Sequence, residues 1–211
     1  MDIASDPQVV EETTGRRKLM NAALRLAAEN RGIQALGIRE IAREAELNHN
    51  TFYRHFADME ALALAVADEL GVELRSKLHK LRSTITNLAD MPRLTVRYTF
   101  EFIEQHPEAF TVAVRERYGP YPLVRNSLQK LLHNLASDMV DDAKQFGRVA
   151  GVDDQTIFDI ANTVIRHIFF VSMDYIAEPE NRAQIEQWAA KLIQLLYMGT
   201  VISAKSEVNN S

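Results

Sequence analysis

The sequence predicts an all-α protein of about nine helices, with three in an N-terminal head and six in a C-terminal body. Apolar residues recur three and four positions apart along most of the chain, as on one face of a helix. Glycine and proline are few, at 8 and 6 of 211 residues. No segment shows the alternation of apolar and polar residues that a strand requires.

The N-terminal segment, residues 1–13, is acidic and is expected to be disordered, and it lacks the basic-then-apolar order of a signal peptide. A first helix is predicted from about Thr14 to Asn30, and Gly32 ends it. Three basic residues open this helix, where positive charge opposes the helix dipole. A phosphate partner would explain their position, and a solvated basic end is the alternative. The apolar stripe of this helix comprises Leu19, Ala22, Ala23, Leu26 and Ala27.

Residues 33–56 predict two short helices joined by a tight turn. Ile38, Ile41, Ala42 and Ala45 have the spacing of one buried helical face. Asn48 is a favourable N-cap for the second helix, because its side chain can accept a hydrogen bond from a following backbone amide. A short polar, aromatic and basic helix after an amphipathic helix is typical of a helix-turn-helix that binds DNA. We therefore place a DNA-binding domain at 14–57 and the rest of the chain, 58–211, in a second domain.

The second helix of this motif supplies the predicted base contacts. Its first turn holds His49, Asn50 and Thr51, and asparagine can pair with adenine while the threonine methyl can meet thymine. Contacts to phosphates position a protein and base contacts specify the sequence. Partial packing in the head is the alternative for Tyr53. For His55 the alternative is packing or capping against the helix that begins at Asp58. The remaining DNA-binding candidates are Arg16, Arg17, Lys18, Arg39, Asn48, Tyr53, Arg54 and His55.

The body is expected to contain six helices separated by proline and glycine. Asp58 is a favourable N-cap for a long helix that continues to about Arg82. Pro92 and Pro107 suit first helical positions. Residues 119–122, Gly-Pro-Tyr-Pro, form a loop. The later helices are predicted over about Leu123–Phe146, Asp153–Ala177 and, after a break at Pro179, Arg182–Ala204.

The last two predicted helices are apolar around much of their circumference, so they need partners on more than one face. One face can meet the body and the other a second copy of the chain, since two-fold dimers are the commonest assembly. A self-sufficient core is the alternative. A two-fold dimer would bind palindromic DNA. The predicted interface residues are Ile157, Val164, Ile168, Val171, Ile185, Trp188, Leu192, Leu195 and Leu196.

The net charge of -5 is unevenly distributed along the chain. Residues 13–56 hold 8 basic and 4 acidic side chains, a net +4, and residues 57–211 hold 16 and 21, a net -5. Because salt confines phosphate attraction to roughly 10 Å, a basic head on an acidic body can bind DNA. Chance is the alternative explanation for the basic head.

The string IREIAREAELNHNTFYRHFADMEAL resembles the DNA-binding signature of the TetR family of bacterial transcriptional regulators. Within this family, TFYRHFADMEAL, EFIEQHPEAF and VRERYG are similar to the FabR-type and DesT-type regulators of unsaturated fatty-acid synthesis. The family usually has glycine in the turn where this chain has Glu46. Glycine accepts positive φ freely, so Glu46 must either take mild strain or reshape the turn.

The resemblance implies an effector of the fatty acyl thioester kind, such as an acyl-CoA, bound in an apolar tunnel with a cationic mouth. A guanidinium suits the phosphate of such a ligand. The alternative for the aromatic and methionine candidates is simple core packing. The ligand-binding candidates are Phe100, Phe102, Ile103, Phe110, Arg115, Arg117, Phe169, Phe170 and Met173.

Catalysis, metals and cofactors are not expected. The chain has no cysteine, which fits a cytoplasmic protein. It does not have the two Glu-x-x-His motifs on facing helices that a di-iron site needs, and its serines lack a neighbouring His and carboxylate. No apolar run reaches the ~20 residues that span a bilayer. The sequence therefore predicts a homodimeric repressor that binds operator DNA and a small apolar effector. A helical ligand-binding or interaction protein without specific DNA binding is the alternative.

Overall fold

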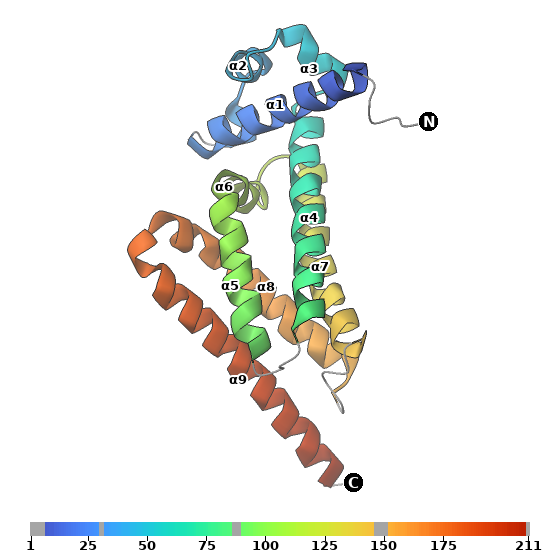
Figure 1. The fold of residues 1–211 in the computed structure, drawn as a ribbon, viewed down its shortest axis with the longest axis vertical. Helices are drawn as coiled ribbons and strands as arrows, with labels where there is room; N and C mark the ends of the chain where they lie inside the picture. Colours follow the sequence, from blue (N-terminus) through green and yellow to red (C-terminus); the bar gives the residue numbers. More distant parts are fainter. Residues whose placement is uncertain (1–6, 30–31, 86–89, 146–151, 210–211) are drawn as a thin grey trace. The chain divides into compact units, whose positions relative to one another are not determined.

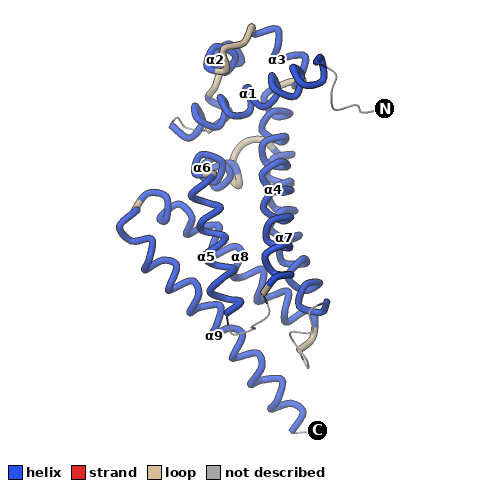
Figure 2. The backbone as a smooth tube through the Cα atoms, in the orientation of Figure 1, coloured by secondary structure: helices blue, strands red, loops and turns tan. Residues whose placement is uncertain are grey.

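The computed structural model describes residues 7–29, 32–85, 90–145 and 152–209, and all regular structure within them is helical (Figure 2). Two short 3-10 helices, η2 (Ile33–Ala35) and η4 (Pro179–Asn181), accompany the α-helices. The predicted all-α class and number of helices are confirmed. The described residues form nine α-helices, which are α1 (Pro7–Glu29), α2 (Ile38–Glu44), α3 (His49–His55), α4 (Met59–Thr84), α5 (Met91–Gln105), α6 (Pro107–Glu116), α7 (Pro122–Gln145), α8 (Asp154–Ala177) and α9 (Arg182–Asn209).

Two helix ends differ from the prediction. Helix α1 begins at Pro7, so residues 7–13 of the segment expected to be disordered are helical. Proline suits the first helical position because its fixed φ matches the helix and its missing N–H would have no partner there. Helix α9 continues past Ala204 to Asn209. The predicted ends Asn30 and Phe146 lie outside the described residues.

The chain divides into two compact units. Unit 1 comprises Met1–Leu70 and Thr111–Leu128, and unit 2 comprises Gly71–Phe110 and Gln129–Ser211. Helices α4, α6 and α7 each contribute to both units. The predicted domain boundary at residue 57 stays a prediction.

Unit 1 is built around the packing of α1 against α2 and α3 (Figure 1). The predicted apolar stripes face inward, and Leu19, Ile41 and Phe52 are fully buried. Ala42 and Ala45 are buried beside them. Helix α4 begins as predicted after Asp58, whose Oδ1 accepts a hydrogen bond from the Ala61 N–H at 2.8 Å.

Unit 2 contains α8 and α9, which are joined by η4 and pack on each other and on α5 (Figure 1). Helix α8 begins after Asp153, whose Oδ1 accepts the Thr156 N–H at 2.9 Å. By length and mean hydropathy, 1.2 over an 18-residue window, α8 meets the criterion for a membrane span. Several of its apolar residues, among them Val164 and Ile168, line a cavity.

Candidate nucleic-acid interface and ligand cavity

The turn between α2 and α3 contains a residue in the left-handed conformation. Glu46 has a φ of 57°. The Glu46 N–H donates to Arg43 O at 3.0 Å, and the Leu47 N–H donates to Ala42 O at 2.8 Å. These two bonds form the Schellman motif, in which glycine usually takes the left-handed position. Glu46 was expected either to take mild strain or to reshape the turn. The structure shows the first outcome, because Glu46 takes the left-handed conformation and the Schellman motif is formed.

Asn48 caps α3 as predicted. Its Oδ1 accepts a hydrogen bond from the Asn50 N–H at 2.9 Å. This bond satisfies one of the backbone donors that a helix start leaves open. The cap fixes the direction in which the first turn of α3 projects.

The inner face of α3 is part of the core of unit 1. Phe52 is fully buried, and its ring centroid lies 5.7 Å from that of Phe56. Thr51 is only 8% exposed, and its Oγ1 lies 3.3 Å from Arg54 Nη2, which donates to it. Thr51, whose methyl group was predicted to meet thymine, is thus largely buried in this structure.

The outer face of α3 is polar and exposed. His49, Asn50 and Arg54 are exposed, and Tyr53 is 59% exposed. The exposed side of Tyr53 leaves it free to contact a partner, although its ring also meets Phe52 at a centroid distance of 5.6 Å. This face presents hydrogen-bonding groups, an aromatic ring and a cation on one short helix.

The other predicted DNA contacts divide into packed and exposed residues. Arg16 forms an ion pair with Glu69 at 3.2 Å, and its guanidinium lies 5.5 Å from the centroid of Phe56. His55 packs on Gly15 of α1, where an added Cβ would lie 2.9 Å from Nε2, and its contact to DNA stays a prediction. The remaining three, Arg17, Lys18 and Arg39, are exposed.

Two side chains of helix α6 form hydrogen bonds with backbone groups of unit 1. Arg115 Nη1 donates to Ala27 O at 3.0 Å and to Ala28 O at 2.9 Å, near the end of α1. Glu116 Oε1 accepts the Ile33 N–H at 3.1 Å. Burial raises the pKa of the Glu116 carboxyl, and the Ile33 N–H partly offsets this effect. Arg115, a predicted ligand contact, thus binds the protein's own backbone, and sequence reasoning did not identify Glu116.

A largely apolar cavity of about 170 Å³ lies within unit 2. Its walls come from α4, α5, α6, α7, α8 and α9, together with Val152. Two of the predicted ligand contacts line it, Phe110 and Phe169. Sequence reasoning missed most of the lining, because these residues look like ordinary core positions: Leu74, Leu78, Met91, Leu132, Leu135, Met139, Ile160, Ala161, Ile165 and Ile193.

The other predicted ligand contacts lie elsewhere. Phe100, Phe102 and Ile103 are buried in packing, with Phe100 stacked on Tyr175 at a centroid distance of 4.3 Å. Phe170 is 71% exposed, and Met173 is half-buried. The guanidinium of Arg117 lies 5.4 Å from the ring of Tyr118. None of these belongs to the described lining of the cavity.

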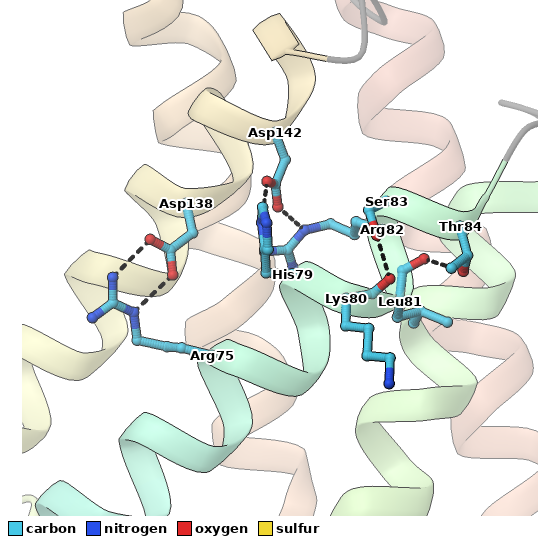
Figure 3. A network of polar contacts seen from close by, with 9 residues as sticks. All are labelled: Arg75, His79, Lys80, Leu81, Arg82, Ser83, Thr84, Asp138 and Asp142. Atoms are coloured by element: carbon cyan, nitrogen blue, oxygen red, sulfur yellow. Dashed lines mark hydrogen bonds and ion pairs between the residues drawn. The ribbon is translucent and has the colours of Figure 1, made fainter.

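Four polar residues line the cavity, Arg82, Thr95, Thr99 and Asp142. Arg82 donates through Nε to Asp142, and each of these residues is 3% exposed. Figure 3 shows Asp142 between Arg82 and His79, whose Nδ1 lies 2.7 Å from Asp142 Oδ1. One turn away, Arg75 binds Asp138 through two hydrogen bonds of 2.7 and 2.8 Å. These pairs join α4 to α7.

The predicted interface residues fall into two groups. Ile157, Val164 and Ile168 line the cavity. On the outside, Trp188 is 50% exposed and Leu195 is 57% exposed. The other four, Val171, Ile185, Leu192 and Leu196, are half-buried. The role of both groups in a dimer stays a prediction.

Two histidines of unit 2 are packed against aromatic rings. The ring centroid of His133 lies 5.0 Å from that of Phe158, and that of His167 lies 4.7 Å from that of Trp188. Burial lowers the pKa of His167. Among the described residues, no group of three or more His, Asp or Glu side chains is arranged to hold a metal ion.

Residues 19–66 match the family model of bacterial regulatory proteins of the tetR family. This segment contains the helix-turn-helix formed by α2, the Glu46 turn and α3. Over residues 19–66 the chain is thus similar to bacterial regulatory proteins of the tetR family.

Solved structures share this fold. The fatty acid degradation regulator FadR from Bacillus halodurans is 14% identical, covering 86% of this chain and 94% of its own, with a TM-score of 0.69. A putative TetR-family transcriptional regulator from Syntrophomonas wolfei is 18% identical, covering 89% and 95%, with a TM-score of 0.69. FadR from Bacillus subtilis in complex with stearoyl-CoA is 15% identical, covering 85% and 96%, with a TM-score of 0.61. At these identities the likeness is one of fold.

Proposed function

We propose that this protein is a homodimeric repressor that binds a palindromic operator through the outer face of α3. Binding of an apolar effector in unit 2 then weakens or strengthens its affinity for the operator. The observation that carries the proposal is the exposed set His49, Asn50, Tyr53 and Arg54 on a helix fixed by a cap and a buried aromatic. In a helix-turn-helix, the N-terminal residues of the second helix meet base edges in the major groove.

The proposed contacts to bases and phosphates come from different residues. Asn50 pairs with adenine, and His49 is the second base contact. Arg54 and Tyr53 bind phosphates, together with Arg17, Lys18 and Arg39. Arg16 and His55, which pack within unit 1, support the position of α1 and α3 rather than contact DNA.

The dimer is proposed to form through α8 and α9. Their exposed aromatic and aliphatic residues, Phe170, Trp188, Leu195 and Met198, give a surface that water solvates poorly. A second copy would cover these residues and place two recognition helices on one palindrome.

The effector is proposed to occupy the cavity of unit 2. Helix α6 supports this coupling, because Phe110 lines the cavity while Arg115 and Glu116, further along the same helix, bind backbone groups next to α1 and α2. Helix α4 likewise begins in unit 1 and contributes Leu78 to the cavity of unit 2. An effector that binds two states with different affinities shifts their populations and so the affinity for DNA.

A fatty acyl thioester is the named candidate for this effector. The FabR-type and DesT-type strings in the sequence support it, as does the likeness of fold to FadR proteins, one of them solved with stearoyl-CoA. The cavity here, about 170 Å³, is close to an engineered cavity of about 150 Å³ that binds benzene. A long acyl chain would therefore require the wall residues to move.

Salt-dependent binding to duplex DNA tests the proposal against the alternative of a ligand-binding protein that does not bind DNA. Fluorescence anisotropy with labelled fragments of the source genome is measured from 50 to 200 mM salt. We expect the logarithm of the affinity to fall linearly with the logarithm of the salt concentration. If the protein binds no fragment at 50 mM salt, the proposal is contradicted and the ligand-binding protein without DNA binding is supported.

A further inference from the structure

The lining of the cavity in unit 2 includes one pair of opposite charges that balance each other. Among the described residues that line it, Arg82 and Asp142 are the charged ones, and they pair with each other. Both are 3% exposed. A buried ion pair of this kind is balanced only as long as no third charge joins it, because an uncompensated buried charge is costly.

The lining also includes Thr95, whose hydroxyl group has no hydrogen-bond partner among the described residues. Thr99, one turn later on α5, donates its hydroxyl to Thr95 O at 2.7 Å, as threonine in a helix commonly does. Thr95 Oγ1 is buried and makes no hydrogen bond within the described residues. A rotation about χ1 exchanges the positions of its hydroxyl and methyl groups, so this hydroxyl can serve a ligand.

From this arrangement we infer that the cavity selects an apolar molecule carrying one uncharged polar group, and excludes its carboxylate counterpart. The inference rests on the proposed function, because it assigns the chemistry of the effector. An alcohol, ester, amide or thioester can exchange a hydrogen bond with Thr95 without adding charge beside Arg82 and Asp142. A free carboxylate would add a second negative charge beside Asp142.

Three probes of one size test this selection, namely 2-phenylethanol, ethylbenzene and phenylacetate. Each has a single ring, which suits a cavity of about 170 Å³. Binding is measured on the full chain at pH 8 by ligand-observed NMR titration. We expect 2-phenylethanol to bind roughly 2- to 10-fold more tightly than ethylbenzene, as one net hydrogen bond allows. Phenylacetate should bind at least about 10-fold more weakly than 2-phenylethanol.

Two matched variants assign the effect to one hydroxyl. Thr95→Val removes the open hydroxyl at nearly constant volume, and Thr99→Val removes the hydroxyl that is already bonded to the backbone. We expect T95V to abolish the advantage of 2-phenylethanol over ethylbenzene and T99V to retain it. Equal loss in both variants, or an equal loss of affinity for ethylbenzene, would mean that Thr95 has only a structural role and would overturn the inference.

Two further outcomes would contradict the inference. Phenylacetate binding as tightly as 2-phenylethanol would contradict the exclusion of charge, and the absence of binding by all three probes would overturn the inference as a whole. Neither result concerns α3. The same preparation is therefore assayed for salt-dependent binding to duplex DNA, so that failure of the proposed regulator is recognised separately from failure of the ligand assignment.

Discussion

Glu116 of α6 accepts a hydrogen bond from the backbone N–H of Ile33, with 3.1 Å between Oε1 and N. Gly32, just before Ile33, has a φ of 111° and leaves room for this carboxylate, since a Cβ there would lie 2.9 Å from Oε1. The contact holds the segment that leads into α2. A residue of α6 thus helps to set the start of the helix-turn-helix.

The Glu116 carboxyl should make stability depend on pH. Burial raises its pKa above the usual 4.5, so the folded protein keeps this proton at pH values where the unfolded chain has lost it. Stability therefore falls as pH rises from about 4.5 through the raised pKa, and Glu116→Gln should remove that fall. Urea unfolding at pH 5 and pH 8 measures this.

The control for this variant is Glu108→Gln, which changes an exposed carboxylate on the same helix. We expect E108Q to follow the wild-type pH dependence. If E116Q and the wild type lose stability in parallel between the two pH values, Glu116 does not titrate as its burial predicts.

Replacing Glu46 by glycine should stabilise the protein. The left-handed conformation costs an ordinary residue about 1–2 kcal/mol, whereas glycine adopts it freely but loses more chain entropy on folding. We therefore expect Glu46→Gly to raise the free energy of unfolding by roughly 0.5–1 kcal/mol, measured by urea titration. Glu46→Ala removes the same charge but keeps Cβ, and it should give no such gain.

The turn at Glu46 illustrates what the sequence could predict. Asn48 and Asp58 were identified as caps because capping depends on residues that are close in sequence. The apolar stripe around Ile41 was predicted for the same reason. The first turns of α1 were missed, since the polar composition of residues 1–13 outweighed the helix-starting signal of Pro7.

Contacts between distant residues could not be predicted in the same way. Arg115 was assigned to a ligand because guanidinium groups bind anions, but carbonyl groups of α1, 87 and 88 residues away, are its partners. Phe110 and Phe169 line the cavity, where their contact with a ligand stays a prediction, whereas Phe100 stacks on Tyr175. Helical spacing shows that a residue is buried, and only the packing of several helices decides whether it meets a cavity or another side chain.

The exposed apolar surface of α9 should mediate the dimer. Leu195 is 57% exposed, and a glutamate there would bury an unpaired charge in the proposed interface. We expect Leu195→Glu to shift the protein from dimer to monomer in sedimentation velocity. Gln194→Glu changes the adjacent exposed residue by one charge and should remain dimeric. A dimeric L195E, or a monomeric wild type at micromolar concentration, would contradict an interface at this surface.

Substitutions in α3 should separate base contacts from phosphate contacts. Asn50→Ala should lower the preference for one base pair in each half-site by about 1–3 kcal/mol. Arg54→Ala should instead weaken binding to all sequences and reduce the salt dependence. Lys80→Ala, which removes an exposed cation from unit 2, is the control and should bind as the wild type does. Uniform loss on every sequence for N50A would contradict its proposed contact to a base.

Selection of duplexes from a random library by the wild-type dimer tests the DNA-binding role of α3 most directly. We predict enrichment of a palindrome with half-site centres one helical turn apart, and loss of preference at one symmetric pair of positions when N50A replaces the wild type. Failure to enrich any sequence, or enrichment of the same sequence with the same preference by N50A and R54A, would show that α3 does not recognise DNA.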